Sequence, residues 1–247
     1  ELCLLRSCLS LPKFAYSMRT CHPTYLQTTY QGFDNLQRRT LGLILGQHPS
    51  DIAWSQVTLP VPLGGIGLRS AEAHSAAAFI ASVSQVAPLV SKLLPDTISG
   101  RESNNAFALL QKFSGIASWS SFEMLPLHHS QHDLSLEIEK THLASLRPRL
   151  SPRHLALLNS LSLPHSSDWL NVVSSPTLGL HLHTQEFVKV VLYRLGLPIF
   201  IASRPCPAPT CHQDCDVLGD HALHRLADEG AKTGRHNRIR DIIFRMA

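Results

Sequence analysis

Along most of this chain, apolar residues recur at the spacing of amphipathic helices. Between positions 25 and 45 they return every three or four residues, which predicts a helix with Tyr30, Phe33 and Leu36 on one face. Gly46 follows directly and is expected to end this helix, because glycine is common just past a helical C-terminus.

Further helix starts are marked by hydroxyl side chains that can accept a hydrogen bond from the first helical turn. They are Ser50, Ser70, Ser151 and Thr184. The alanine-rich helix after Ser70 is expected to reach about Val86. Signals for strands are few, so the predicted fold class is mainly α.

A loop rich in proline and glycine, LPVPLGGIGLRSA, interrupts the helical pattern at 59–71. Gly64 and Gly65 permit backbone angles that other residues avoid, so a structural turn is the favoured interpretation. A phosphate-binding loop is the alternative, but neither the Walker nor the dinucleotide spacing is present.

The composition allows a packed core and argues against a strongly basic protein. Hydrophobic residues make up 44% of 247 residues, while the formal net charge is only +4. Any contact with nucleic acid must therefore be argued from local clusters of positive charge. No apolar run of about 20 residues is evident, so no membrane span and no membrane partner are expected.

The six cysteines do not have the spacing of a disulfide framework. Cys3, Cys8 and Cys21 are scattered over helical sequence and are expected to be buried free thiols. A reducing compartment fits this usage, which predicts an intracellular location in the nucleus or cytoplasm.

Candidate metal ligands crowd into one stretch near the C-terminus. Cys206 and Cys211 are separated by four residues, and His221 follows after Leu218-Gly219-Asp220. Zinc in a structural site takes four thiolate or imidazole ligands in a tetrahedron, so this set predicts a closed zinc site. A loop with free thiols and surface histidines is the alternative, and no open position for zinc hydrolysis is indicated.

The fourth ligand is left open by the spacing. Cys215 and His224 are both candidates, while His212 and Asp220 are weaker ones.

A basic run follows the cysteines, and its residues are Arg235, His236, Asn237, Arg238 and Arg240. Guanidinium groups match phosphate oxygens, so this run is a candidate nucleic-acid contact. A solvated helix face is the equally weighted alternative. Convergent carboxylates and a nucleophile–base pair are not evident, so no catalytic residues are predicted.

Several segments together resemble the C-terminal part of a non-LTR retrotransposon reverse transcriptase polyprotein, of the type that ends in a restriction-like endonuclease. The segments are LLRSCLSLPKFAYSMRT (4–20), FDNLQRRTLGLILG (33–46), WSQVTLPVPLGGIGLRSAEAHSAAAFIAS (54–82), EFVKVVLYRLGLPI (186–199), LGDHAL (218–223) and RHNRIRD (235–241).

The resemblance implies four regions and a parent protein that copies RNA into DNA. A thumb-like helical region would span 1–50, a helical linker 51–200, a zinc knuckle 201–234, and the basic start of a truncated endonuclease 235–247. The implied partners are RNA or DNA, the polymerase palm upstream and the nuclease downstream. The paired catalytic aspartates of the palm are missing here, so this chain would be catalytically incomplete.

The resemblance also bears on the metal ligands. Cys206, Cys211 and His221 match the first three ligands of the family's CCHC knuckle. The fourth is a cysteine in the family, but Arg225 stands at that position here. Either Cys215 or His224 substitutes for it, or the site no longer binds zinc.

Two functions of different classes follow from these patterns. The leading hypothesis is a nucleic-acid-binding fragment of a retroelement polyprotein whose parent activity is RNA-directed DNA polymerisation. The alternative is a helical domain for protein–protein interaction or structure, suggested by the modest charge and by the small-residue helix at 70–86.

Overall fold

The computed structural model describes residues 2–93, 100–114, 131–172, 175, 177, 182–206, 211–221 and 237. The chain divides into two compact units, residues 1–195 and 196–247. The described residues are mainly helical, which confirms the predicted fold class.

The described part of the first unit is built mainly from helices. Its α-helices are α1 (Leu2–Ser7), α2 (Ala15–Thr20), α3 (Gln27–Leu45), α4 (Asp51–Thr58), α5 (Ala71–Leu93), α6 (Gly100–Ser114), α7 (Gln131–Leu146), α8 (Pro152–Leu161) and α9 (Thr184–Arg194). Its 3-10 turns are η1 (Leu11–Lys13), η2 (Pro23–Leu26), η3 (Val61–Leu63), η5 (Arg147–Arg149) and η6 (Asp168–Leu170).

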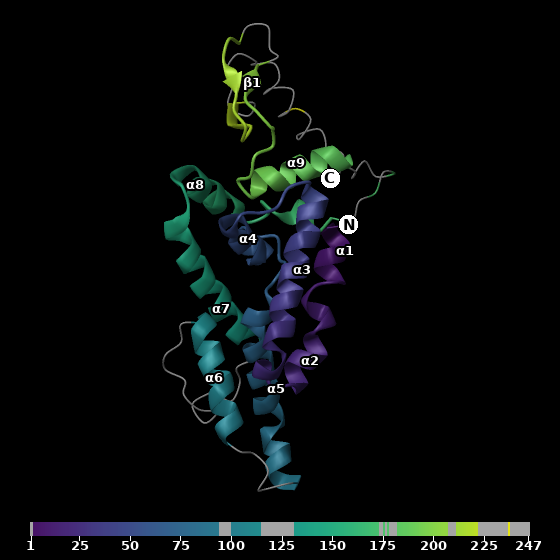
Figure 1. Ribbon diagram of the computed structural model, residues 1–247, viewed down its shortest axis with the longest axis vertical. Coiled ribbons are helices and arrows are strands. Elements are labelled where there is room, and N and C mark those ends of the chain that lie inside the picture. Colours follow the sequence, from purple (N-terminus) through teal and green to yellow (C-terminus); the bar gives the residue numbers. More distant parts are fainter. Residues whose placement is uncertain are drawn as a thin grey trace. The chain divides into compact units, whose positions relative to one another are not determined.

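The α5 helix lies at the centre of the first unit, with α2 and α3 on one side and α6 and α7 on the other (Figure 1). Ala76, Ala77 and Ile80 pack against Phe107 of α6, while Ala78 joins a separate cluster with α2 and α3. Small side chains on both faces let the neighbouring helices approach closely. The alanines of α5 therefore contribute to the packing of the core.

The start of α5 is held by two polar side chains. Ser70 Oγ accepts a hydrogen bond from the Ala73 N–H at 3.1 Å, as the sequence predicted for this cap. Asp34 Oδ1 accepts a second bond from the Ala71 N–H at 2.7 Å, and Asp34 Oδ2 accepts one from the Ser70 hydroxyl. Burial raises the pKa of Asp34, and these hydrogen bonds oppose that rise. Two side chains thus satisfy backbone groups that the helix itself leaves unpaired.

The same helix departs from the sequence expectation at its other end. It continues through Pro88 to Leu93 instead of ending near Val86. By length and composition its segment Ala71–Val90 could cross a membrane, and 44% of that window is buried. Because α5 packs on both sides against other helices, we interpret it as a core helix.

The glycine-rich loop is a tight structural turn that closes against α4. Gly64 has a φ of 84°, in the left-handed region that favours glycine. A Cβ atom on Gly65 would lie 1.9 Å from the Leu59 carbonyl oxygen, so no larger residue fits without movement. The buried guanidinium of Arg194 donates to the Gly65 carbonyl at 2.8 Å. The loop's geometry is explained by packing, without a phosphate ligand.

Three local predictions were wrong in detail. On α3, Leu36 is 57% exposed and the polar Gln37 is buried instead. The N-cap of α9 is His183, whose N–H donates to the Glu186 carboxylate at 3.1 Å, so Thr184 is the first helical residue. The thiols expected to be buried in the N-terminal region are exposed; they belong to Cys3, Cys8 and Cys21.

The second unit contains a short antiparallel hairpin of β1 (Arg204–Pro205) and β2 (Asp214–Cys215). Arg204 pairs with Cys215. Hydrogen bonds from Ile199 N and Phe200 N to the Val217 carbonyl, at 2.9 and 3.1 Å, continue the contact beyond the strands. The hairpin brings the two ends of the Cys/His segment together.

Candidate metal centre

Three of the predicted ligands meet in the second unit. The potential ligand atoms of Cys206, Cys211 and His221 all lie within 4.8 Å of one another. Within this group, Cys211 Sγ and His221 Nε2 are 3.3 Å apart. The cluster could therefore hold a metal ion.

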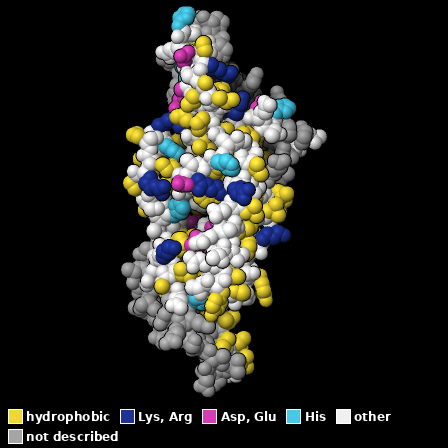
Figure 2. All heavy atoms as spheres, in the orientation of Figure 1, with side chains coloured by type: hydrophobic (Ala, Val, Ile, Leu, Met, Phe, Trp, Pro, Cys, Tyr) yellow, Lys and Arg dark blue, Asp and Glu magenta, His cyan; other side chains and the backbone are white. Residues whose placement is uncertain are grey.

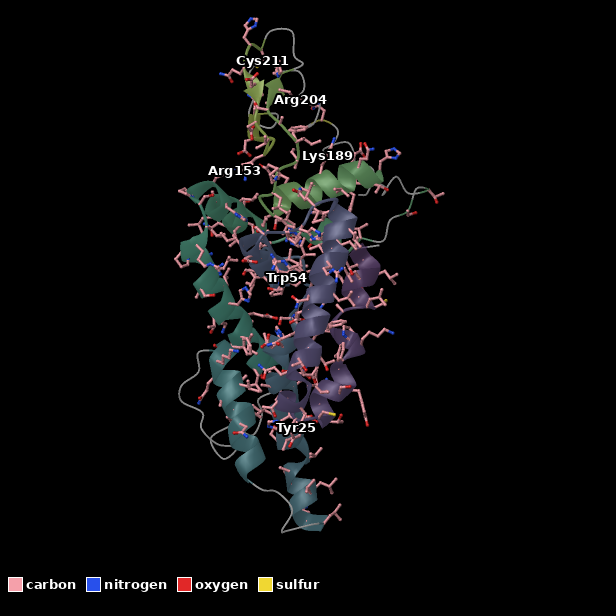
Figure 3. All side chains as sticks on the ribbon, viewed as in Figure 1. Tyr25, Trp54, Arg153, Lys189, Arg204 and Cys211 are labelled. Carbon is pink, nitrogen blue, oxygen red and sulfur yellow. The ribbon has the colours of Figure 1, made fainter. Side chains whose placement is uncertain are left out.

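The hairpin places Cys206 in this cluster. Its N–H donates to the Gln213 carbonyl at 3.0 Å, directly beyond the strand pair. Ser203 Oγ donates to the Cys215 carbonyl at 2.9 Å and ties the opposite side of the hairpin. Figure 3 labels Cys211 and Arg204 within this small unit.

His221 is positioned by a carboxylate that the sequence reasoning missed. Asp216 Oδ1 accepts a hydrogen bond from the His221 N–H at 2.7 Å, and Oδ2 accepts from Leu218 and Asp220 at 3.0 and 3.2 Å. Burial alone would raise the pKa of Asp216, but these backbone N–H groups outweigh burial and lower it. The ionised carboxylate thus fixes the turn that presents His221. The available sequence signal was Asp216 followed three residues later by Gly219, because aspartate and glycine are typical of turns. In the structure Gly219 has a positive φ.

The observed spacing suits a tetrahedral metal with sulfur and nitrogen ligands. Zinc lies about 2.3 Å from sulfur and about 2.0 Å from nitrogen, so two such ligands in a tetrahedron are about 3.5 Å apart. The 3.3 Å between Cys211 Sγ and His221 Nε2 is close to that value. Movements on the order of 1 Å would bring all three ligands to zinc distance. A metal held here would tie the hairpin, the intervening loop and the His221 turn to one another.

Among the fourth-ligand candidates, Cys215 belongs to the same buried environment. Its exposed fraction is 4%, and Cys206, which follows the paired strand β1 directly, is also buried. Burial, followed by the neighbouring Cys206, raises the pKa of the Cys215 thiol. His212 is exposed and Asp220 half-buried.

The remaining predicted residues are not brought into the cluster by the part of the chain that the structure describes. His224 lies outside the described residues, as do Arg235, His236, Arg238 and Arg240 of the basic run. Asn237 is described, and it is half-buried.

Beside the cluster, the hairpin exposes a cation and apolar side chains. The Arg204 guanidinium lies over the Phe200 ring at 4.5 Å from its centroid, and Ile201 is fully exposed. Sequence reasoning missed this group, because no local pattern marks two residues four positions apart as stacking partners. An exposed arginine stacked on an aromatic ring offers both a charge and a flat apolar surface.

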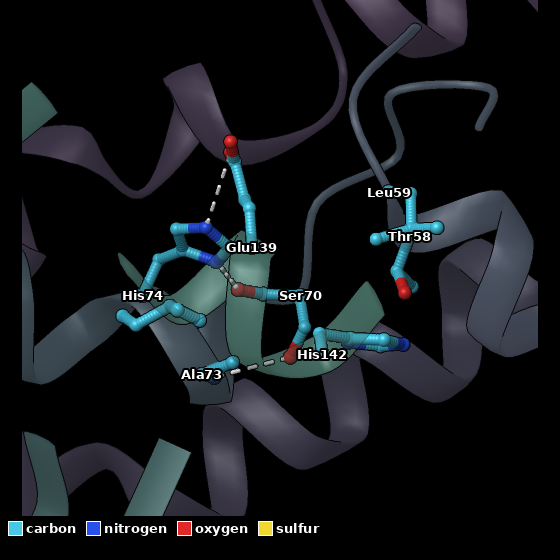
Figure 4. Close-up of a pocket in the computed structure, with 8 residues that line it drawn as sticks. Thr58, Leu59, Ser70, Ala73, His74, Glu139 and His142 are labelled. Atoms are coloured by element: carbon cyan, nitrogen blue, oxygen red, sulfur yellow. Dashed lines mark hydrogen bonds and ion pairs between the residues drawn. The ribbon is translucent and has the colours of Figure 1, made fainter. Parts of the chain in front are cut away.

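A second polar cluster lies inside the first unit, between α5 and α7 (Figure 4). Glu139 Oε1 lies 2.8 Å from Arg69 Nη2 and 3.7 Å from His74 Nε2. The adjoining cavity has a volume of about 10 Å³. That volume is near the minimum for one water molecule and far below the several hundred Å³ of a ligand pocket. This cluster is therefore interpreted as structural.

Another histidine also serves the fold. His154 Nε2 lies 2.6 Å from Gln56 Oε1, and Gln56 Nε2 donates to the Gly64 and Arg194 carbonyls, both at 3.0 Å. Burial lowers the pKa of His154, which favours the neutral ring in this network. The network links α4, α8 and α9 around the glycine turn.

Comparisons with known protein families, curated proteins and solved structures returned no match.

Proposed function

We propose that this chain is a nucleic-acid-binding part of a retroelement reverse transcriptase polyprotein, held at its C-terminal end by a zinc knuckle. The observation that carries the proposal is the convergence of Cys206, Cys211 and His221 in one small unit. These are the residues that the sequence resemblance assigns as the first three knuckle ligands. The resemblance and the geometry thus select the same side chains independently.

Zinc is the metal that this donor set favours. Two thiolates and an imidazole are soft or borderline ligands, which suit zinc better than magnesium or calcium. The described part of the second unit buries few apolar side chains, so a bound metal would supply much of its folding free energy. The role assigned to zinc is structural.

Nucleic acid is the proposed partner because cations and flat surfaces accompany the knuckle. Arg204 on Phe200 can contact a phosphate or stack on a base. The sequence beyond the knuckle adds the arginines at 235, 238 and 240. In the first unit, Lys and Arg side chains gather across the middle of the face shown in Figure 2, where α3 and α4 lie. These groups favour a polyanion.

The chemistry of the parent polyprotein is assigned to other regions. The resemblance places the paired aspartates of the polymerase upstream and the acidic nuclease residues downstream. We therefore expect neither DNA synthesis on a primed template nor nicking of supercoiled DNA by this chain with magnesium. Either activity, if detected, would contradict the proposal.

A gel-shift series with the whole chain tests the binding. We expect complexes with single-stranded RNA or DNA that weaken with salt, with a log–log slope of about −0.7 for each phosphate contact. Arg204→Ala should reduce the magnitude of the slope by about 0.7 if Arg204 contacts one phosphate. Cys211→Ser should weaken binding of the nucleic acid. Cys21→Ser should not, because Cys21 is an exposed cysteine at the end of α2. Absence of any complex at low salt would contradict nucleic-acid binding.

A second candidate function is protein–protein interaction through the first unit. Large apolar side chains are exposed on two of its helices, including Leu43 of α3 at 81% and Leu89 and Leu93 of α5 at 59% and 69%. Surfaces of this kind favour association. Light scattering distinguishes the candidates, because concentration-dependent oligomers without nucleic-acid binding would favour this one.

A further inference from the structure

Cys215 has a buried thiol in the second unit. A metal ion held only by Cys206, Cys211 and His221 would not use it. A tetrahedral structural zinc site takes four protein ligands, and the cluster of mutually close ligand atoms contains three. Cys215 and Cys206 are the two buried cysteines among the described residues. The next question is why these two cysteines are buried together in one short hairpin.

The register of the hairpin explains why these two thiols meet. Cys215 is paired with Arg204, and side chains two residues apart on a strand point to the same face. Cys206 follows Arg204 by two positions, so it shares the face of Cys215 as a diagonal neighbour. Both cysteines are buried, which agrees with this placement.

We propose that Cys215 is the fourth ligand, which makes the centre a Cys₃His site with Cys206, Cys211 and His221. This inference rests on the proposed metal-binding function and identifies its ligand set. Arg225 follows His221 by four residues, but a guanidinium offers no lone pair to a metal. The hairpin supplies a buried thiol on the face that Cys206 occupies.

Cys215 Sγ is not among the mutually close ligand atoms, so binding in this arrangement requires this sulfur to move toward them. Rotation about the Cα–Cβ bond of Cys215 moves its sulfur without disturbing the backbone pairing. Zinc then displaces one proton from each of three thiols, the protons pass to solvent, and the imidazole binds in its neutral form.

Cobalt(II) substitution of the whole chain tests the ligand set, because the intensity of sulfur-to-cobalt charge-transfer absorption follows the number of bound thiolates. We expect tetrahedral cobalt with three thiolates in the unmodified chain. Cys215→Ser should lower the charge-transfer absorption to about two thirds, the ratio of two thiolates to the three expected for a complete site. It should also weaken metal binding by more than about tenfold, since even outer-shell losses cost about 10–100-fold.

Three matched variants complete the experiment. His224→Asn and Cys21→Ser should leave both the spectrum and the affinity unchanged. Cys215→His should keep tetrahedral coordination with reduced charge transfer, which shows that loss in Cys215→Ser is not a folding failure. A full three-thiolate spectrum in Cys215→Ser, or a loss of affinity in His224→Asn, would overturn the assignment while leaving the metal site intact. No tetrahedral cobalt in the unmodified chain would overturn the metal site as well.

Discussion

The two units of this protein differ in the side chains that their described residues bury. In the first, apolar side chains from α5, α6 and α7 form a continuous buried cluster that includes Ile80, Phe107 and Ile138. In the described part of the second, the buried side chains are those of Leu197, Cys206 and Cys215. Packing is therefore sufficient to explain the order of the first unit, whereas we propose that a metal held by Cys206, Cys211 and His221 stabilises the second.

This difference predicts different responses to substitution in the two units. Burial of apolar area contributes about 25 cal/mol per Å², so a helix bundle accumulates stability over many positions. A small module that buries less apolar area can instead gain its folding free energy from a bound metal. Substitutions should therefore have graded effects in the first unit and all-or-none effects in the second.

The largest expected effect is that of metal removal. Structural zinc contributes about 10–16 kcal/mol of apparent folding free energy in small modules, so a strong chelator should unfold the second unit. Amide hydrogen exchange should show loss of protection at Cys206 and Ile199, while α3 and α5 stay protected. Unchanged protection at Cys206 after chelation would show that the second unit does not need a metal.

Phe107→Ala should have the next largest effect, which is a loss of stability in the first unit. Phe107 is 2% exposed in the helical core, and such truncations cost about 3–5 kcal/mol. Urea denaturation followed by helical circular dichroism measures this loss. Tyr16→Ala, at a side chain that is 79% exposed, is the control and should cost little. If Phe107→Ala also abolished metal binding, then metal binding by the second unit would depend on the core of the first unit.

Gly65→Ala should destabilise the first unit by about 1–3 kcal/mol, because its Cβ would overlap the Leu59 carbonyl and force the turn to shift. Gly32→Ala in α3 is the matched control, since no atom lies within 4 Å of its added Cβ. Removing a helical glycine should stabilise by about 0.5–1 kcal/mol. Thermal unfolding of both variants measures the contrast, and equal shifts would contradict the packing explanation of the loop.

The smallest expected effect is a change in the stability of the first unit with pH. Burial lowers the pKa of His142 in the folded first unit, so the unfolded chain binds a proton there more readily. Stability should therefore fall as the pH decreases below about 6.5, the ordinary histidine value. His142→Gln keeps a donor for the Ser55 carbonyl and should reduce this pH dependence. Urea midpoints at pH 7.5 and pH 5.5 test it, and an identical pH dependence in both proteins would contradict the assignment.

Local sequence rules predicted the helical class and several caps, because each depends on residues close together in the chain. Ser50 and Ser151 accept hydrogen bonds from the N–H groups of Ala53 and His154, both at 3.2 Å. Periodicity failed at Leu36, where tertiary contacts bury Gln37 instead. A spacing rule identifies apolar positions but does not establish which of two adjacent faces meets a neighbouring helix.

For the candidate site too, the sequence identified some of the residues and missed others. Residue type and spacing were sufficient to identify Cys206, Cys211 and His221 as possible ligands. They did not identify Asp216, because its role depends on the turn that brings its carboxylate to the His221 N–H. Nor did they choose between Cys215 and His224, and the proposal of Cys215 depends on the register of the hairpin.

Elemental analysis of the purified chain measures whether the cluster of Cys206, Cys211 and His221 binds zinc. We predict one zinc per chain in the unmodified protein, loss of that zinc in Cys211→Ser, and its retention in Cys21→Ser. A protein that folds in both units and contains no zinc would contradict the proposed metal site.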